Sequence, residues 1–216
     1  MTNTQFAVRL EVQPSPIIDG IKNIEQDRFS LSGGEHAQFS KYLDLLTKWQ
    51  KTHRLIGSTE PRWIVESLFL DSLLFLRVLP PGIASLLDLG SGAGVPGIPI
   101  KLVRPTIQLM LVESRRRRAS FLSTVVRELA LSGTRVISGR AEDHLGELAG
   151  RFDAVVMRCA GDVSELFPLA ARLVVAGGVV VASGPPAQQG LSLGEWVSVE
   201  GAQPGLTRRF AVYRGA

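Results

Sequence analysis

The sequence is poor in the residues that form disulfides and metal sites. Its 216 residues include one cysteine, Cys159, and three histidines. A single cysteine cannot form an internal disulfide, and the histidines are scattered without metal-ligand spacing. We therefore expect no disulfide and no metal. We assign Cys159 no catalytic role, because the sequence places no base beside it and a small buried cysteine is the commoner case.

The chain also lacks the apolar segments that targeting and membrane insertion require. No run approaches the roughly 20 apolar residues of a membrane span, and the longest one is interrupted by Asp71 and Arg77. The first residues do not combine basic residues, an apolar core and a cleavage site. We expect a cytoplasmic protein with no membrane partner.

The composition that remains is that of a folded protein with a modest excess of positive charge. Hydrophobic residues make up 45% of the chain and charged residues 20%, which favours one globular domain with a sizeable core. We expect an N-terminal extension over residues 1–32 and a single monomeric domain over 33–216, with helices in 33–82 and an α/β core in 83–216. The formal net charge of +4 suits a polyanionic partner without requiring one.

Hydrophobic periodicity predicts two helices before the sheet. Apolar residues recur at three- and four-residue steps over residues 35–51, which indicates an amphipathic helix. A second helix should begin at Pro61, with Ser58 or Thr59 as its cap, and end at Pro80.

The rest of the chain alternates between strands and helices, which predicts a mostly parallel, doubly wound α/β sheet. The segments 195–200 and 207–213, on either side of residues 203–205, indicate an antiparallel hairpin at the sheet edge. Such an ending favours the Rossmann-like methyltransferase fold over the dehydrogenases. The expected strands are 84–89, 107–113, 134–138, 152–157, 177–183, 195–200 and 207–213, and the helices are 96–103, 115–131 and 163–175.

The most informative motif joins the first of these strands to a helix through a glycine-rich turn. Its pattern from Asp88 to Gly94 is Asp-x-Gly-x-Gly-x-Gly. Glycines permit positive φ and close approach of a ligand, and the following helix offers free N–H groups. A dinucleotide fingerprint would need a third glycine where Val95 stands. The spacing instead resembles the first motif of the S-adenosylmethionine (SAM) methyltransferases, so we assign the cofactor site Asp88, Gly90, Gly92 and Gly94.

Three charged residues follow the ends of the later strands, where ligands bind in such folds. Glu113 ends the second strand and is expected to accept ribose hydroxyls, or else to pair with an arginine at the surface. Glu142 follows the third strand and either holds an adenine amino group or belongs to an ordinary acidic loop. Arg158 ends the fourth strand and either meets an anionic ligand or forms a structural ion pair with Asp88 or Glu113.

Four consecutive arginines, Arg115, Arg116, Arg117 and Arg118, begin the helix after the second strand. Cations at a helix N-terminus oppose the macrodipole, so this unfavourable placement suggests another use. A solvated face is the alternative, and we favour contact with RNA phosphates. Trp49 lies on the apolar stripe of its helix, so we expect it in the core rather than stacked on a base.

Together these segments resemble one family, the bacterial 16S ribosomal RNA guanine-N7 methyltransferase G, also called glucose-inhibited division protein B. The resemblance runs from about residue 38 to 183, and the segment 88–99 with its two prolines is the most specific part. It implies SAM as cofactor, with Gly90, Val95, Ala141, Glu142 and Arg158 at the cofactor-contacting positions and Ser114 beside Glu113 in a matched segment. The other matched segments are 48–51, 70–73, 103–105, 113–114 with 117–118, 121–122, 140–142 and Arg158 with Ala160.

Three departures from the family pattern lie away from the glycine motif. Arg54 stands where the family has asparagine, Leu68 replaces a histidine, and Ser183 begins a segment that replaces a lysine. We expect these positions to face the substrate, so they bear on the guanine target more than on cofactor binding. Arg54 is expected to contact RNA phosphates.

The reaction that the resemblance implies makes few demands on side chains. Guanine N7 already carries a lone pair, so no general base is required and we assign no catalytic residue. N7 lies in the deep major groove of an RNA helix, so the target in the small ribosomal subunit must be in a loop or splayed out. Two alternatives remain: a SAM-dependent enzyme with another RNA, protein or small-molecule acceptor, and a non-catalytic RNA-binding relative that retains the SAM pocket.

Overall fold

A computed structural model of the protein describes residues 33–158, 163–183, 190–202 and 205–215. The predicted extension over 1–32 lies outside these residues, as do Cys159 and Gly184. Within the described ranges, no helix is both long enough and apolar enough to cross a membrane.

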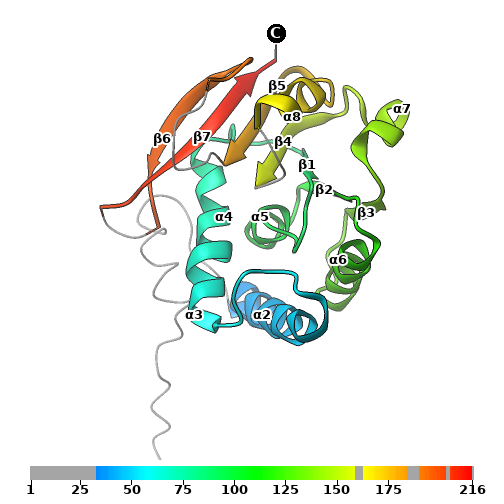
Figure 1. Cartoon of the computed structure of the whole chain (residues 1–216), viewed down its shortest axis with the longest axis vertical. Helices are drawn as coiled ribbons and strands as arrows, with labels where there is room; N and C mark the ends of the chain where they lie inside the picture. Colours follow the sequence, from blue (N-terminus) through cyan, green and yellow to red (C-terminus); the bar gives the residue numbers. More distant parts are fainter. Residues whose placement is uncertain (1–32, 159–162, 184–189, 203–204, 216) are drawn as a thin grey trace, which may run out of the picture.

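The described residues form a seven-stranded sheet in the order β3-β2-β1-β4-β5-β7-β6 (Figure 1). The first five strands of this order are parallel to one another, whereas β7 is antiparallel to both β5 and β6. The predicted mostly parallel sheet with a hairpin at its edge is confirmed. The strands are β1 Ser85–Leu89, β2 Gln108–Glu113, β3 Thr134–Ser138, β4 Phe152–Arg158, β5 Val174–Ser183, β6 Glu195–Glu200 and β7 Thr207–Arg214.

Both faces of the central strands are covered, which explains why their apolar runs do not alternate with polar residues. On β1, Leu86 belongs to one core cluster and Leu87 to another, because successive side chains point to opposite faces. The first cluster includes residues of α2 Gly33–His53, α5 Gly97–Val103 and α6 Arg116–Glu128; the second includes residues of α7 Leu145–Leu148 and α8 Val163–Ala171.

The predicted second helix is present but irregular. It runs without interruption through α3 Pro61–Ile64, a π-helical turn η1 Val65–Leu70, α4 Asp71–Leu73 and a 3₁₀ turn η2 Leu74–Arg77. Its cap is neither Ser58 nor Thr59. The carboxylate of Glu60 accepts hydrogen bonds from the N–H groups of Arg62 and Trp63, while the Ser58 hydroxyl accepts from Glu60 N.

One predicted helix end is corrected, and two short helices were not predicted. The helix expected over 163–175 ends at Ala171, because Val174 already pairs with Phe152 at the start of β5. The stretch after β3 forms two short helices that the sequence analysis missed, η3 Ala141–His144 and α7.

Candidate functional site

The glycine loop after β1 needs glycine for reasons of backbone conformation. Gly90, Gly92 and Gly94 have φ of 75°, 57° and 92°, in the region that L side chains rarely adopt. The N–H groups of Gly90 and Ser91 both donate to the carbonyl of Val112, at 2.9 and 3.0 Å, and fasten the loop to β2. The motif therefore builds a tight turn at the carboxyl end of the first strand.

Close packing imposes a second requirement on the loop. A Cβ at Gly94 would clash with Ile98 and would stand 2.8 Å from the Tyr42 hydroxyl. That hydroxyl donates to the carbonyl of Ala93 at 2.6 Å, and burial raises the pKa of Tyr42 well above its usual value, so it remains a donor. This hydrogen bond fastens the glycine loop to helix α2.

The structure places Asp88 beneath the glycine loop. Its side chain is fully buried, and Oδ2 accepts a hydrogen bond from Gly97 N at 2.8 Å, whereas Oδ1 has no partner. Burial raises the pKa of Asp88 to about 7, with the charge of Glu113 adding to the rise and the Gly97 bond and Arg158 opposing it. The carboxyl group thus holds the start of α5 in position and exposes no surface to a ligand.

Glu113 lies at the same loop with both carboxylate oxygens engaged. Oε2 accepts from Gly92 N at 2.9 Å and Oε1 from Arg115 N at 2.7 Å, so the side chain ties the loop to the start of α6. It is 4% exposed. Each carboxylate oxygen has a second lone pair, so the group can still accept a hydroxyl.

A cavity of about 120 Å³, which we call the β2 cavity, lies at the carboxyl ends of β1, β2 and β3. It brings together four residues that were assigned to the cofactor from three separate segments, namely Gly90, Ser114, and the adjacent Ala141 and Glu142. Leu89, Val112, Leu166 and Leu169 give it apolar walls, and Gly139 and Arg140 complete the lining. Small-molecule sites are lined mostly by apolar side chains with a few placed polar groups, and the β2 cavity has a lining of this kind. The other residues assigned to the cofactor do not line it, namely Asp88, Gly92, Gly94, Val95, Glu113 and Arg158.

Arg158 forms a nearly buried ion pair with a residue that the sequence analysis did not assign. Its Nη1 lies 3.3 Å from Oδ2 of Asp71, and the two side chains are 12% and 14% exposed. The guanidinium also donates to the carbonyls of Ser67 and Leu68, in the π-helical turn η1. A structural ion pair was one of the two expectations for Arg158, but the expected partners, Asp88 and Glu113, were wrong.

Asp71 also pairs with Arg208 of the hairpin, whose Nε lies 2.8 Å from Oδ1. One carboxylate therefore joins two guanidinium groups from β4 and β7. The matched segment Leu70-Asp71-Ser72-Leu73 was the signal in the sequence that could have identified it.

A second cavity at the same edge of the sheet, the hairpin cavity, has a volume of about 360 Å³. Gly90 directly follows β1, and Arg158 ends the neighbouring strand β4. Arg158 lines the hairpin cavity and Gly90 the β2 cavity, so the two cavities flank the β1–β4 pair. The hairpin cavity is lined by Glu66, Ser67, Asp71, Arg158, Gly201, Ala202, Leu206, Thr207 and Arg208.

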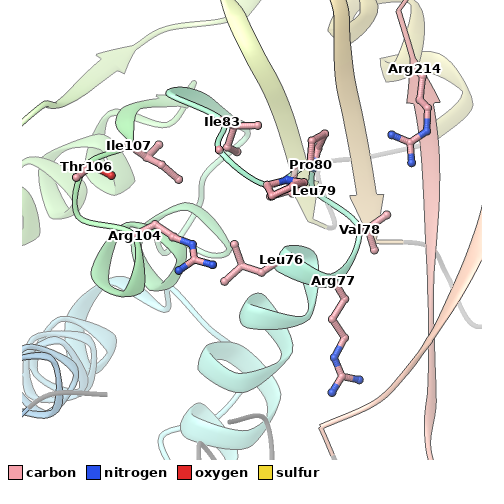
Figure 2. Close-up of a pocket in the computed structure, with 12 residues that line it drawn as sticks. Leu76, Arg77, Val78, Leu79, Pro80, Ile83, Arg104, Thr106, Ile107 and Arg214 are labelled. Carbon is pink, nitrogen blue, oxygen red and sulfur yellow. The ribbon is translucent and has the colours of Figure 1, made fainter. Parts of the chain in front are cut away.

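A third cavity, of about 520 Å³, lies at the opposite edge of the sheet (Figure 2). Ile83 and Ile107 line it just before β1 and β2 begin, and Arg214 lines it from the end of the antiparallel β7. Ligands of such sheets bind at the carboxyl ends of the strands, so this cavity does not belong to the same site.

The arginine run lies at the carboxyl edge, beside the glycine loop. Arg115, Arg116 and Arg117 are exposed, whereas Arg118 is half-buried, with Nη1 3.7 Å from the point where a Cβ of Gly92 would stand. Helices α2 and α6 pack together in opposite directions, as the contacts of Trp49 with Phe121 and of Lys41 with Glu128 show.

The ring of Trp49 packs against the core, as predicted.

Arg54 is exposed and follows the last turn of α2. Because α2 and α6 run in opposite directions, Arg54 lies near the start of α6, where the arginine run is. We call Arg54, Arg115, Arg116 and Arg117 the arginine surface. The other two departures do not face an open surface. Leu68 is 7% exposed and Ser183 is 6% exposed, and neither lines the β2 cavity or the hairpin cavity, so the expectation that they face the substrate stays a prediction.

The expectation that no metal is bound stays a prediction. Among the residues that the structure describes, no group of three or more histidine, cysteine, aspartate or glutamate side chains could hold a metal ion.

Comparison with known proteins gives a consistent result. The family model described as rRNA small subunit methyltransferase G matches residues 35–187. The ribosomal RNA small subunit methyltransferase G of Desulfitobacterium hafniense is 37% identical over 162 residues, which cover 74% of this chain and 67% of that protein. The protein of the same name from Clostridium botulinum is 34% identical over 159 residues, 72% of this chain and 66% of that protein. The matched segment thus spans about two thirds of the length of these relatives.

A solved structure extends the likeness of fold across the sheet. The O-methyltransferase TomG from Streptomyces achromogenes, in complex with SAM, superimposes with a TM-score of 0.56 at 18% identity, covering 89% of this chain and 94% of that one. At this identity the likeness concerns the fold alone. It agrees with the Rossmann-like architecture predicted from the alternating strands and helices.

Proposed function

Because the chain belongs to the rRNA small subunit methyltransferase G family, we propose that it transfers the methyl group of SAM to N7 of a guanine in the 16S rRNA of the small ribosomal subunit. The observation that carries the proposal is the β2 cavity, which gathers Gly90, Ser114, Ala141 and Glu142 beside the glycine loop. The arginine surface lies at the same edge of the molecule, where RNA phosphates would reach it.

The residues of the loop and cavity fit SAM. The positive φ of Gly90 and Gly92 brings bare backbone to the surface, where an amino-acid moiety can approach closely. Glu113 can accept the ribose hydroxyls with its remaining lone pairs, and Glu142 can accept the adenine amino group. The apolar walls of the β2 cavity suit the adenine ring. When bound, SAM supplies an activated methyl group.

The protein's own part in the reaction is positioning. Guanine N7 carries an in-plane lone pair at neutral pH, so no side chain has to remove a proton before the methyl group is accepted. The rate enhancement then comes from holding the two reactants in line and excluding water. Arg158 contributes to this alignment by keeping the end of β4 fixed through Asp71 and the carbonyls of η1.

The test is methyl transfer from radiolabelled SAM to small subunits isolated from a strain that lacks the gene, followed by chemical cleavage at N7-methylguanine. Label at one guanine is the expected result. In parallel, S-adenosylhomocysteine should raise the melting temperature while NADH does not, because a ligand that binds the folded state stabilises it. Binding without label in 16S rRNA would overturn the proposal and point to another acceptor or to a non-catalytic binding protein.

A further inference from the structure

We propose that the hairpin cavity receives the acceptor guanine and that Glu66 and Arg208 recognise its base edge. This inference rests on the proposed function, because it takes the β2 cavity as the site of the methyl donor. Both cavities lie at the carboxyl edge of the sheet, one lined by Gly90 just after β1 and the other by Arg158 at the end of the neighbouring strand β4. A methyl group that passes from one ligand to the other has to cross between these two strand ends.

The polar groups of the hairpin cavity match the hydrogen-bonding edge of guanine. Guanine offers two donors, N1–H and the N2 amino group, next to the acceptor O6. The carboxylate of Glu66 can accept from the two donors, and the guanidinium of Arg208 can donate to the acceptor. Adenine would instead present the unprotonated N1 to the carboxylate, and two acceptors facing each other leave a polar group unsatisfied.

Both recognition groups are held in place by neighbours. Oε1 of Glu66 accepts from Nε of Arg62, one helical turn away, at 2.7 Å. Arg208 is held by Asp71 through Nε at 2.8 Å and Nη2 at 3.1 Å, and its side chain, which lines the cavity, is 33% exposed. A planar guanidinium fixed in this way loses less freedom when it binds a ligand.

The apolar part of the cavity suits the face of a base. Leu206 is a large hydrophobic residue that is 55% exposed, and it lines the cavity next to Ala202. A base splayed out of an RNA helix has to exchange stacking against its neighbours for packing against the protein. Leu206 and Ala202 offer the apolar surface for that exchange.

The outer wall of this cavity lies beyond the segment that the family model matches. Gly201, Ala202, Leu206, Thr207 and Arg208 all follow residue 187, where that match ends. Arg208 reaches back to Asp71, which lies inside the match, and Asp71 in turn holds Arg158. Acceptor recognition in this chain is therefore shared between the matched segment and the hairpin.

The test compares Glu66→Gln and Arg208→Ala with two matched controls in the full-length protein. Arg209→Ala removes the neighbouring arginine on the other side of β7, and Glu147→Gln alters an exposed carboxylate that pairs with Arg135. We expect the KM for small subunits to rise, and kcat/KM to fall about 10- to 100-fold, in both cavity variants. The affinity for S-adenosylhomocysteine should stay unchanged, the controls should behave as wild type, and Arg208→Lys should recover part of the loss.

The outcomes separate the inference from the proposed function. No methylation of 16S rRNA by the wild-type protein would remove the proposed function itself. Methylation by the wild type together with wild-type kinetics in Glu66→Gln would overturn the guanine pocket alone. An equal loss of S-adenosylhomocysteine affinity would also overturn it, because the effect would then be structural. If Arg208→Ala fails to fold, Glu66→Gln tests the inference, since glutamine has the size of glutamate and the paired Arg62 is 72% exposed.

Discussion

Arg158 and Asp71 connect the end of strand β4 to the irregular helix before the sheet, with Nη1 and Oδ2 3.3 Å apart. Because Asp71 also holds Arg208, removing its carboxylate leaves two guanidinium groups without their anionic partner. We expect Asp71→Ala to lower the free energy of unfolding by about 2–4 kcal/mol, since breaking a largely buried ion pair strands a charge.

Urea denaturation measures this loss, and Glu147→Ala serves as the comparison. Its ion pair with Arg135 has side chains 42% and 69% exposed, so solvent screens it and the change should stay below about 1 kcal/mol. Equal effects in the two variants would mean that the Arg158–Asp71 pair contributes no more than a surface ion pair.

The glycine loop gives a prediction about ligand affinity. Gly94→Ala places a Cβ against Ile98 and the Tyr42 hydroxyl at a φ of 92°, so the loop must shift. We expect the Kd for S-adenosylhomocysteine to rise by at least about 10-fold, as calorimetric titration would measure. Gly146→Ala is the matched control, because its Cβ would meet nothing within 4 Å. Unchanged affinity in Gly94→Ala would separate the loop from the ligand site.

Asp88 gives the stability a defined dependence on pH. Its pKa is about 7 in the folded protein and near 4 in an unfolded chain. Between pH 4 and pH 7 the Asp88 carboxyl group is therefore ionised in the unfolded chain and protonated in the folded protein. The contribution of this group to stability is therefore fully present below pH 4 and is lost as pH rises through 7, at up to about 1.4 kcal/mol per pH unit.

Asp88→Asn removes that titration while an amide oxygen can still accept from Gly97 N. The decline of unfolding free energy between pH 5 and 7, followed by urea titration at each pH, should be shallower in the variant than in the wild type. If the unfolding free energy falls with pH at the same slope in the variant and the wild type, the raised pKa of Asp88 is contradicted.

The arginine surface predicts a salt-dependent affinity for RNA. Replacing Arg115 and Arg116 together by glutamate should weaken binding to small subunits and reduce the slope of log K against log salt by about 2, roughly one per lost phosphate contact. Arg151 and Arg172 are exposed arginines at the opposite edge of the sheet, and their double replacement by glutamate is the control. If affinity and slope are the same in both double variants, the arginine run is a solvated face.

Local patterns in the sequence were enough to predict the elements that bury apolar residues. The parallel strands, the edge hairpin and the helix over 35–51 follow from periodicity and turn residues, and the structure confirms them. The cap of the second helix was missed because glutamate is not among the residues that usually cap a helix. Here the carboxylate of Glu60 accepts hydrogen bonds from the N–H groups of Arg62 and Trp63.

The site was predictable where a residue follows a strand, and not where it depends on a long-range partner. Gly90, Ser114, Ala141 and Glu142 meet in one cavity because the carboxyl ends of parallel strands converge at one edge. The matched segment 70–73 pointed to Asp71, but its pairing with Arg158 could not be deduced, because Asp71 follows a π-helical turn whose geometry no local pattern specifies. Leu68 and Ser183 were expected to face the substrate from their positions in the family pattern, and local patterns did not indicate that the sheet and its helices bury them.

The hydrogen bond from Tyr42 to the carbonyl of Ala93 also has a consequence for fluctuations of the native state. A transient opening that detaches helix α2 removes the support of the glycine loop, so that opened form binds the loop's ligand less well than the closed one. Ligand then shifts the population away from the opened form. Amide hydrogens of α2, although remote from any bound ligand, should exchange with solvent more slowly as the ligand concentration increases.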